Sequence, residues 1–317
     1  MTPQKFTLLI ITLLSLLNYS ARADEGGRQI VLDIGNDYFT GPEHTDRHLT
    51  SNLSIGIIQS GLFGFAKGFE DSFSPSTKLY SSFALSQFIY TPEDTEAPIP
   101  DPDDQPYAGW LFFTTAMGTR EGNLLNIYQI DLGVVGPAAL GEETQNFYHN
   151  LIGVDQAQGW DYQLHNEFGI NVKMKQAVMP YRYEGAADSD FIYFYGGSLG
   201  NVDTHLEVGG ILRWGYNIPD DMGYRTVDIY DGDFSLFTVF RIYEKIVARD
   251  IFLDGNSDGD SASVEKRPLV TAGSAGLVIR FWDVELGYSY EMSTKRFKTQ
   301  TSPDARGNIS LSYLRSF

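Results

Sequence analysis

The feature that most constrains the fold of this chain is a series of segments, each about ten residues long, in which apolar and polar side chains alternate. On an extended strand this period places the apolar residues on one face and the polar residues on the other. Two segments show it plainly through Leu206, Val208, Leu212, Trp214 and Tyr216, and through Trp282, Val284, Leu286, Tyr288, Tyr290 and Met292. In a third segment the same alternation predicts outward-facing side chains at Leu49, Leu53, Ile55 and Ile57, and inward-facing positions at Thr50, Asn52, Ser54 and Gly56. Both a membrane barrel and a soluble β-sandwich produce this alternation.

The two ends of the chain favour the barrel. Lys5 precedes a short apolar run and Ala21-Arg22-Ala23 follows it, which predicts a secretory signal peptide over 1–23 with cleavage before Asp24. The chain stops on a strand-like segment ending in Phe317, which resembles the insertion signal of outer-membrane barrels. We therefore expect an all-β, transmembrane, antiparallel up-and-down β-barrel of about 12 strands over 24–317, in the bacterial outer membrane.

Composition narrows the possible partners. The 317-residue chain carries a net charge of −18, which becomes −20 once the signal peptide is removed, and this acidity argues against nucleic acid. The absence of cysteine excludes disulfide and thiolate chemistry. We find no internal repeat or second domain, and we expect a monomer that contacts outer-membrane lipids and, during insertion, the barrel assembly machinery.

Links of unequal length separate the strand-like segments. Residues 121–123 form a short link, whereas five links are long and mostly acidic: 91–105, 141–159, 183–190, 250–267 and 293–306. Because short turns of outer-membrane barrels face the periplasm and long loops face outward, we expect all five outside the cell.

One long link predicts a short helix rather than a strand. Gln145 and His149 stand four residues apart and share a helix face, which Ile152 continues one turn later. Among five histidines, His149 is the best candidate for a proton-handling group, because histidine titrates near neutral pH. The alternative is a histidine that only fills a packed loop.

Two further polar segments end the first strand and begin the second. They are 35–41, which contains Asn36 and Asp37, and 45–52, which contains Thr50. Since the end of one strand and the start of the next meet at the same rim of a barrel, Asp37 and Thr50 are expected to lie close together. Asp155 follows the helix of His149.

At this point the residues resemble the outer-membrane lipid A 3'-O-deacylase family. The motifs that carry the resemblance run in order along nearly the whole mature chain: NDYFTG, TDRHLTSN, QPYAGWL, GVVGPAALGEETQNFYHNLIG and GWDYQLHNE. The resemblance implies a twelve-stranded barrel and a calcium-dependent hydrolase, which removes the 3'-linked acyloxyacyl group of lipid A, the anchor of lipopolysaccharide. It also implies site residues at Asn36, Asp37, Thr50, Gln145, His149 and Asp155.

The residue types suit ester hydrolysis, which needs a base for water and a positive group for the oxyanion. His149 is the natural base, and Asp37 is a hard oxygen ligand for Ca²⁺. Asn36 would add a ligand or a donor, and Thr50 would orient the water or act as nucleophile; we prefer orientation, because no G-x-S-x-G motif occurs. The chain departs from the family pattern at Gln105, where many members have arginine, and at Leu49, where an aromatic is common.

Two other functions remain open from the sequence. An outer-membrane phospholipase would use similar chemistry on a glycerophospholipid, and a non-catalytic porin or structural barrel would need none of it. The pattern D-x-N-x-D-G with Glu265 matches an EF-hand loop but is flanked by strand-like runs, so we interpret it as an acidic surface hairpin. Four tryptophans, Trp110, Trp160, Trp214 and Trp282, fit an interfacial belt, and Trp160 has the alternative of forming a wall of the site.

Overall fold

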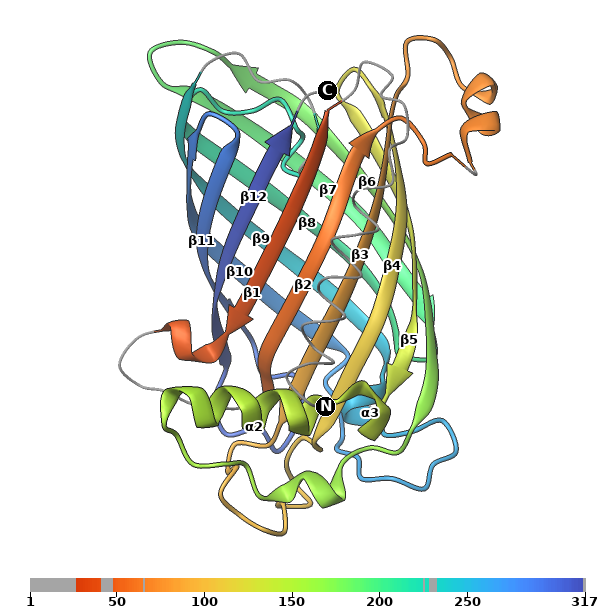
Figure 1. Cartoon of the computed structure of the whole chain (residues 1–317), viewed down its shortest axis with the longest axis vertical. Helices are drawn as coiled ribbons and strands as arrows, with labels where there is room; N and C mark the ends of the chain where they lie inside the picture. The colour runs from red at the N-terminus through yellow and green to blue at the C-terminus, as the bar shows by residue number, and fades with distance from the viewer. Residues whose placement is uncertain (1–26, 41–47, 65, 225, 228–232, 316–317) are drawn as a thin grey trace.

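A closed barrel of antiparallel strands forms the body of the computed structural model (Figure 1), which describes residues 27–40, 48–64, 66–224, 226–227 and 233–315. Each strand pairs with its neighbours in the sequence, and β1 closes the barrel against β12. The described strands are β1 (Arg28–Asn36), β2 (His48–Ser60), β3 (Lys78–Thr91), β4 (Ala108–Glu121), β5 (Leu124–Val135), β6 (Glu167–Tyr183), β7 (Asp188–Gly200), β8 (Asp203–Tyr216), β9 (Phe234–Asp250), β10 (Leu269–Phe281), β11 (Val284–Ser293) and β12 (Asp304–Arg315). The twelve-stranded up-and-down barrel expected from the sequence is confirmed. The predicted signal peptide (1–23) and Phe317 lie outside the described residues.

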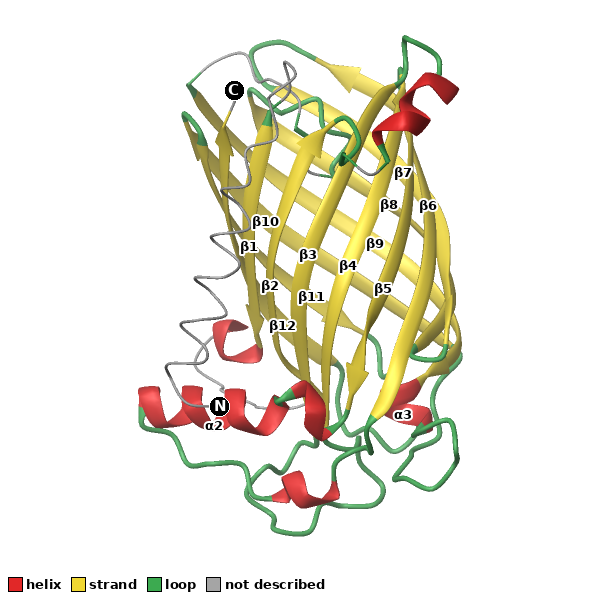
Figure 2. Cartoon of the chain, turned by 45° about the vertical axis from the view of Figure 1, so that its right-hand side comes forward, coloured by secondary structure: helices red, strands yellow, loops and turns green. Residues whose placement is uncertain are grey.

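Short helices lie in the connections between strands (Figure 2). Two are α-helical, α2 (Gly141–Ile152) and α3 (Ile251–Asp254), and four are 3-10 helices: η1 (Asp37–Thr40), η2 (Lys67–Ser72), η3 (Pro137–Ala139) and η4 (Gly159–Tyr162). No helix in the described ranges has the length and apolar character that a membrane crossing requires.

Long connections gather at the end of the barrel that carries α2, here called the α2 end (Figure 1). Residues 92–107, 136–166, 251–268 and 294–303 all lie there, as expected for loops on one side of a membrane. The prediction for 183–190 was wrong. This connection is a short turn between Tyr183 and Asp188, and it lies at the opposite end, because β6 runs away from α2.

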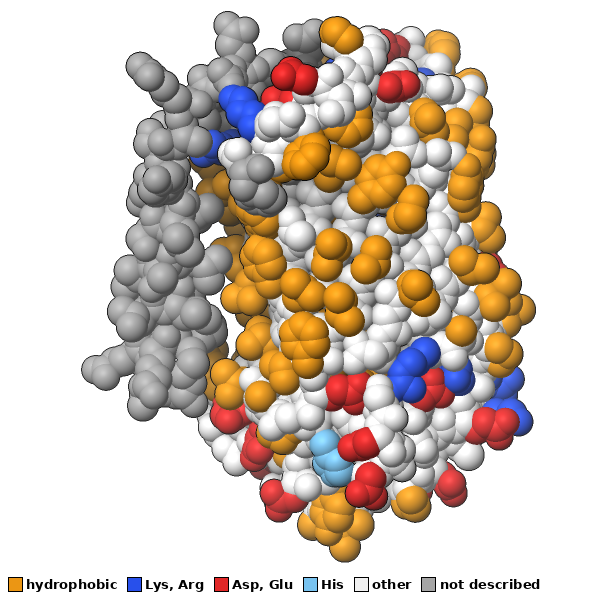
Figure 3. Space-filling model, turned by 90° about the vertical axis from the view of Figure 1, so that its right-hand side faces the viewer, with side chains coloured by type: hydrophobic (Ala, Val, Ile, Leu, Met, Phe, Trp, Pro, Cys, Tyr) orange, Lys and Arg blue, Asp and Glu red, His pale blue; other side chains and the backbone are white. Residues whose placement is uncertain are grey.

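Apolar side chains cover the middle of the outer wall, and charged side chains form bands above and below them on the face that Figure 3 shows. The two alternating segments analysed above point this way, with Leu206 66% exposed and Leu286 48% exposed. Exposed apolar side chains between charged rims are what a lipid-facing belt requires. The tryptophans differ in exposure: Trp214 and Trp282 are exposed, whereas Trp110 and Trp160 are buried. The predicted position in an interfacial belt is therefore wrong for Trp110 and Trp160.

Polar side chains fill the lumen and pair with one another. Lys173 lies 2.8 Å from Asp131, and Arg306 lies 2.6 Å from Glu291. They surround a cavity of about 510 Å³, which Phe252 of α3 covers at the α2 end by stacking on Tyr90. Ion pairing is the condition under which charged groups tolerate such a partly desolvated interior.

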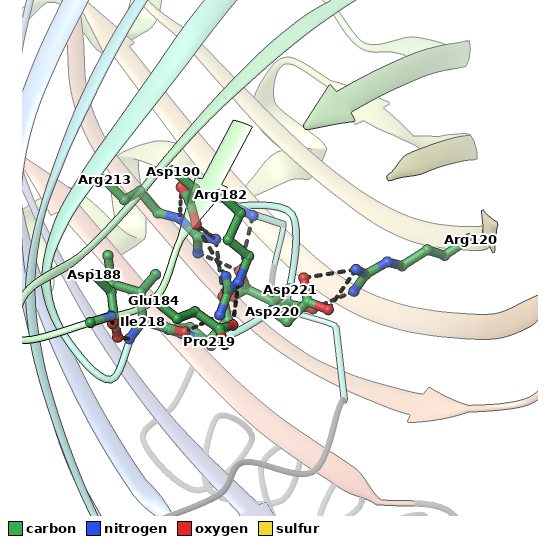
Figure 4. A network of polar contacts seen from close by, with 12 residues as sticks. Arg120, Arg182, Glu184, Asp188, Asp190, Arg213, Ile218, Pro219, Asp220 and Asp221 are labelled. Atoms are coloured by element: carbon green, nitrogen blue, oxygen red, sulfur yellow. Dashed lines mark hydrogen bonds and ion pairs between the residues drawn. The ribbon is translucent and has the colours of Figure 1, made fainter. Parts of the chain in front are cut away.

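At the opposite end of the barrel, the segment that follows β8 folds back into the lumen. Met222 of this segment is fully buried and packs among the inward side chains of β7 and β8. Figure 4 shows the ion pairs that hold the segment: Arg213 donates to Asp190 and Asp221, and Arg120 donates to Asp220. The lumen is therefore occupied from both ends by the chain itself.

Candidate functional site

Helix α2 lies against the outside of the barrel wall at the α2 end. The residues just before it are held by Gln87 of β3, whose Nε2 donates to the carbonyl oxygens of Ala139 and Leu140 at 2.7 and 3.1 Å. Gly109 of β4 allows the close approach, since a Cβ there would lie 3.2 Å from the backbone nitrogen of Gly141. From this anchor α2 runs across the ends of β3 and β2 toward β1, as Figures 1 and 2 both show.

The buried face of α2 carries the predicted site residues. Gly141, Gln145 and His149 are its buried residues, four positions apart and therefore on one stripe. The helix predicted from the sequence is confirmed, but Ile152 does not continue the buried face, because it is 40% exposed. Gly153, at a positive φ of 75°, ends the helix by donating its N–H to the carbonyl of His149.

His149 is buried and oriented by a backbone contact. Its Nδ1 lies 2.6 Å from the carbonyl oxygen of Asp155. A carbonyl oxygen only accepts hydrogen bonds, so Nδ1 must carry the proton and Nε2 of the neutral ring carries the lone pair. The resemblance pointed to the carboxylate of Asp155, but the contact in the structure comes from its backbone, and its side chain is exposed.

Gln145 is fixed one helical turn before His149. Its Oε1 accepts a hydrogen bond of 2.9 Å from Nε1 of Trp160, which is 2% exposed and packs against Tyr107. This contact settles the orientation of the amide, so Nε2 points away from Trp160. Nε2 is buried and has no hydrogen-bond partner among the described residues. A buried donor without a partner costs free energy unless a ligand or water satisfies it.

Thr50 belongs to the outer wall, contrary to the alternation in the sequence. A register shift between Leu49 and Ser51 turns Leu49 toward the lumen, where it lines the central cavity. Thr50 instead contacts Thr91, with 2.6 Å between the two Oγ1 atoms. Two residues before Thr91, Ile89 packs with Tyr107 and Trp160 of the overlying loops. The predicted outer position of Leu49 and inner position of Thr50 are therefore wrong.

Asn36 ends β1 on the same stretch of wall. It pairs with Ser51 of β2 and Gly307 of β12 and is 8% exposed. Asp37, the first residue of η1, follows it, but the side chain of Asp37 lies outside the described part of the structure. The structure thus places Asn36, Thr50, Gln145 and His149 at one end of the barrel, two on the wall and two on the helix face turned to it.

A second polar group lies beside Thr50 and closes the barrel mouth. His48 begins β2, is 1% exposed and has Nε2 3.3 Å from Asp104 and Nδ1 against Asp304. Burial alone would raise the pKa of Asp104, but hydrogen bonds from His48 and from the amides of Glu93 and Gln105 outweigh it and hold this pKa below its usual value. This role of His48 was not predicted, because nothing near it in the sequence marks Asp104 and Asp304 as its carboxylate partners.

Acidic side chains mark the water-facing side of α2 as well. Partial burial raises the pKa of Glu142, and the nearby carboxylates of Glu143 and Asp161 raise it further.

Two partners of the site, Gln87 and Thr91, were not predicted from the sequence, because their role depends on cross-strand register. Trp160 had a sequence signal, since it follows the helix in the GWDYQ motif.

The EF-hand-like pattern at 254–265 does not form an EF-hand. Asp254 ends the four-residue α3, and its carboxylate accepts hydrogen bonds from Lys266 and from the backbone of Asp250. Strands β9 and β10 flank the loop instead of helices. Within the described ranges, no group of three or more His, Cys, Asp or Glu residues is arranged to hold a metal ion.

Comparisons with known proteins agree with this architecture. The family described as outer membrane protein LpxR matches residues 8–315. Among solved structures, LpxR from Salmonella typhimurium is similar with a TM-score of 0.74 and 19% identity, over 90% of this chain and 99% of that chain. The β domain of the Bordetella autotransporter Brka gives a TM-score of 0.42 at 10% identity, over 92% and 99% of the two chains. A search of curated proteins found no match.

Proposed function

The chain belongs to the LpxR family of outer membrane proteins, and we propose that it is a lipid A deacylase that hydrolyses the ester of the 3'-linked acyloxyacyl group in the outer leaflet. The position of the site supports this substrate class. His149 and Gln145 face the outer wall of the barrel rather than its lumen, at the border of the lipid-facing belt. A lipid with its acyl chains in the membrane reaches such a site without leaving the bilayer.

The observation that carries the proposal is the hydrogen bond between His149 Nδ1 and the Asp155 carbonyl. It holds the imidazole in the tautomer whose Nε2 accepts a proton, which is the state that a general base requires. In the proposed reaction His149 takes a proton from water as the water attacks the ester carbonyl. The same nitrogen then returns the proton to the departing sugar oxygen.

The neighbouring side chains orient the substrate and the water. Gln145 Nε2, which points away from Trp160 because Oε1 accepts the indole N–H, donates to the developing oxyanion. Thr50, hydrogen-bonded to Thr91, orients the attacking water. Orienting water suits Thr50 better than acting as the nucleophile. A nucleophilic hydroxyl needs a base beside it, whereas the contact described for Thr50 Oγ1 is with the hydroxyl of Thr91.

Calcium, the cofactor implied by the resemblance, fits the donors at the end of β1. Ca²⁺ prefers carboxylate, amide and backbone oxygens, which Asp37 and Asn36 supply side by side in the sequence. When bound there, the ion would add positive charge beside the ester carbonyl. Asn36 is 8% exposed, so the surrounding residues shield it from most of the solvent.

The structure bears differently on the two alternative functions, a phospholipase and a porin. A phospholipase would use the same residues, so lipid analysis must separate it from a lipid A deacylase. A porin needs an open lumen, whereas here the segment containing Met222 and the helix α3 both fill the barrel interior.

The direct test is mass spectrometry of lipid A from a host that expresses the chain. We expect loss of one acyloxyacyl group with the wild type and a rate about 10²–10⁴-fold lower for His149→Ala, the usual contribution of a general base. His165→Ala is the matched control, because His165 lies in the same loop with its side chain exposed and should keep full activity. Unchanged lipid A with a folded wild-type barrel, and release of fatty acid from phospholipid instead, would favour the phospholipase.

Calcium dependence is tested separately. Chelation should abolish turnover by the wild type, and added Ca²⁺ should restore it, whereas Asp37→Ala should stay inactive at any calcium concentration. Full turnover in the presence of chelator would remove calcium from the proposed mechanism.

A further inference from the structure

One side of α2 carries large apolar side chains that are exposed in the described part of the structure. Phe147 is 60% exposed and Leu151 is 71% exposed, and their spacing of four residues places them on one stripe of the helix. Ile152, on the last turn of the helix, and Val154, just beyond it, add two apolar side chains at 40% and 47% exposure. Soluble surfaces rarely leave so many neighbouring large apolar side chains in water, so this stripe indicates an interaction surface.

The rest of the helix surface is polar or faces the barrel. Counted at 100° per residue, Gln145 and His149 face the wall, Phe147 and Leu151 lie roughly opposite to them, and Asn146 and Asn150 lie between the two. Helix α2 is thus divided into a wall-facing stripe, a polar stripe and an apolar stripe. This is the pattern of a helix that lies in a membrane interface with one side in water and the other in lipid.

The direction of α2 decides which way the apolar stripe points. Seen from outside the barrel, α2 runs from β4 toward β1 across the strand ends, with its wall-facing side behind it (Figure 1). Because an α-helix is right-handed, the stripe of Phe147 and Leu151 then points away from the wall and tilts toward the middle of the barrel. Phe113 of β4 and Ile34 of β1, the strands between which α2 runs, are exposed members of the lipid-facing belt. The apolar stripe therefore continues the belt.

We propose that the stripe formed by Phe147 and Leu151 inserts among the acyl chains of the outer-leaflet lipids and makes α2 an interfacial helix. The occupant is lipid because the stripe is continuous with a surface that already faces lipid, while Glu142 and Asn150 remain in water. Insertion holds the face of His149 at the depth where acyl chains join their headgroups. This inference does not rest on the proposed reaction and applies equally to any lipid substrate.

The absence of cysteine permits a direct test with one label at a time. Leu151→Cys and Phe147→Cys, each labelled with the environment-sensitive fluorophore NBD, are reconstituted in phosphatidylcholine–phosphatidylglycerol vesicles. Glu142→Cys and Asn150→Cys are matched controls at exposed positions outside the apolar stripe of the same helix, and heat-modifiable gel mobility confirms that each barrel is folded. We expect blue-shifted emission and strong quenching by spin-labelled lipid at 147 and 151, with neither effect at 142 and 150.

The depth of the label gives a second readout. Quenching should be stronger with the spin label near the headgroup than near the end of the acyl chain, because interfacial helices enter only about 5–10 Å. Equal emission at all four positions, with equal access to aqueous iodide, would overturn the proposal. A blue shift at 147 and 151 that spin-labelled lipid does not quench would also overturn it, since a protein surface would then cover the stripe.

Discussion

The contact between Trp160 and Gln145 offers the sharpest test of the site. Trp160→Phe keeps an aromatic ring against Tyr107 but removes the only N–H that the indole supplies to Gln145 Oε1. Two consequences follow from the structure. A buried acceptor loses its donor, and the amide of Gln145 becomes free to exchange its oxygen and nitrogen.

The magnitudes follow from the burial of both partners, which are 2% and 4% exposed. An acceptor left unsatisfied costs about 1–3 kcal/mol of stability, and the smaller ring leaves a void that adds about 1 kcal/mol. For catalysis, the hydrogen bond biases the orientation of the Gln145 amide by about 1 kcal/mol, within the usual net value. Without the hydrogen bond the two amide orientations become about equally populated, so kcat should fall by about twofold, with little change in KM.

Two assays measure these effects on the same preparations. Urea unfolding followed by gel mobility gives the loss of stability, and lipid A deacylation in mixed micelles gives kcat and KM. Trp214→Phe is the matched control, because Trp214 is 58% exposed on the lipid-facing wall and should change neither quantity measurably. If Trp160→Phe lost stability but kept its full kcat, the amide of Gln145 would have no part in the reaction.

Two further predictions concern the interior and the mouth of the barrel. Arg213→Met should cost about 3–5 kcal/mol of stability in urea, because it leaves the buried carboxylates of Asp190 and Asp221 without their main partner; Glu184→Gln, which breaks only an exposed ion pair, should cost less than about 1 kcal/mol, and equal losses would contradict this reasoning. The lowered pKa of Asp104 means that its contribution to stability is present above its ordinary pKa of 3.8 and is lost as the pH falls through the lowered value. Unfolding measured across this acid range should therefore be less pH-dependent in Asp104→Asn than in the wild type.

The sequence predicted those features that repeat along the chain. The alternation of apolar and polar residues predicted the barrel and the direction of most side chains, since one face of every strand must meet lipid. The spacing of Gln145 and His149 predicted the buried face of α2, because both helix periodicity and burial are local properties. Such predictions need no knowledge of which strand lies beside which.

Features that depend on register were not predictable in the same way. The shift between Leu49 and Ser51 reverses the alternation at the start of β2 and moves Thr50 from the expected lumen side to the outer wall. A bulge of this kind is set by how two strands align, and single-strand periodicity does not contain it. The lumen contacts of Arg213 likewise join a strand to a loop with no periodic signal.

The register shift at Thr50 also explains why the site lies outside the barrel. Had the alternation continued through residue 50, the hydroxyl would point into the lumen, among the aromatic and paired charged side chains around the central cavity. The bulge brings Thr50 and Thr91 to the wall on which α2 rests, and Gln87 and Gly109 hold the helix there. One extra residue in a strand thus decides whether this barrel presents Thr50, and with it the proposed site, to the lumen or to the outer wall.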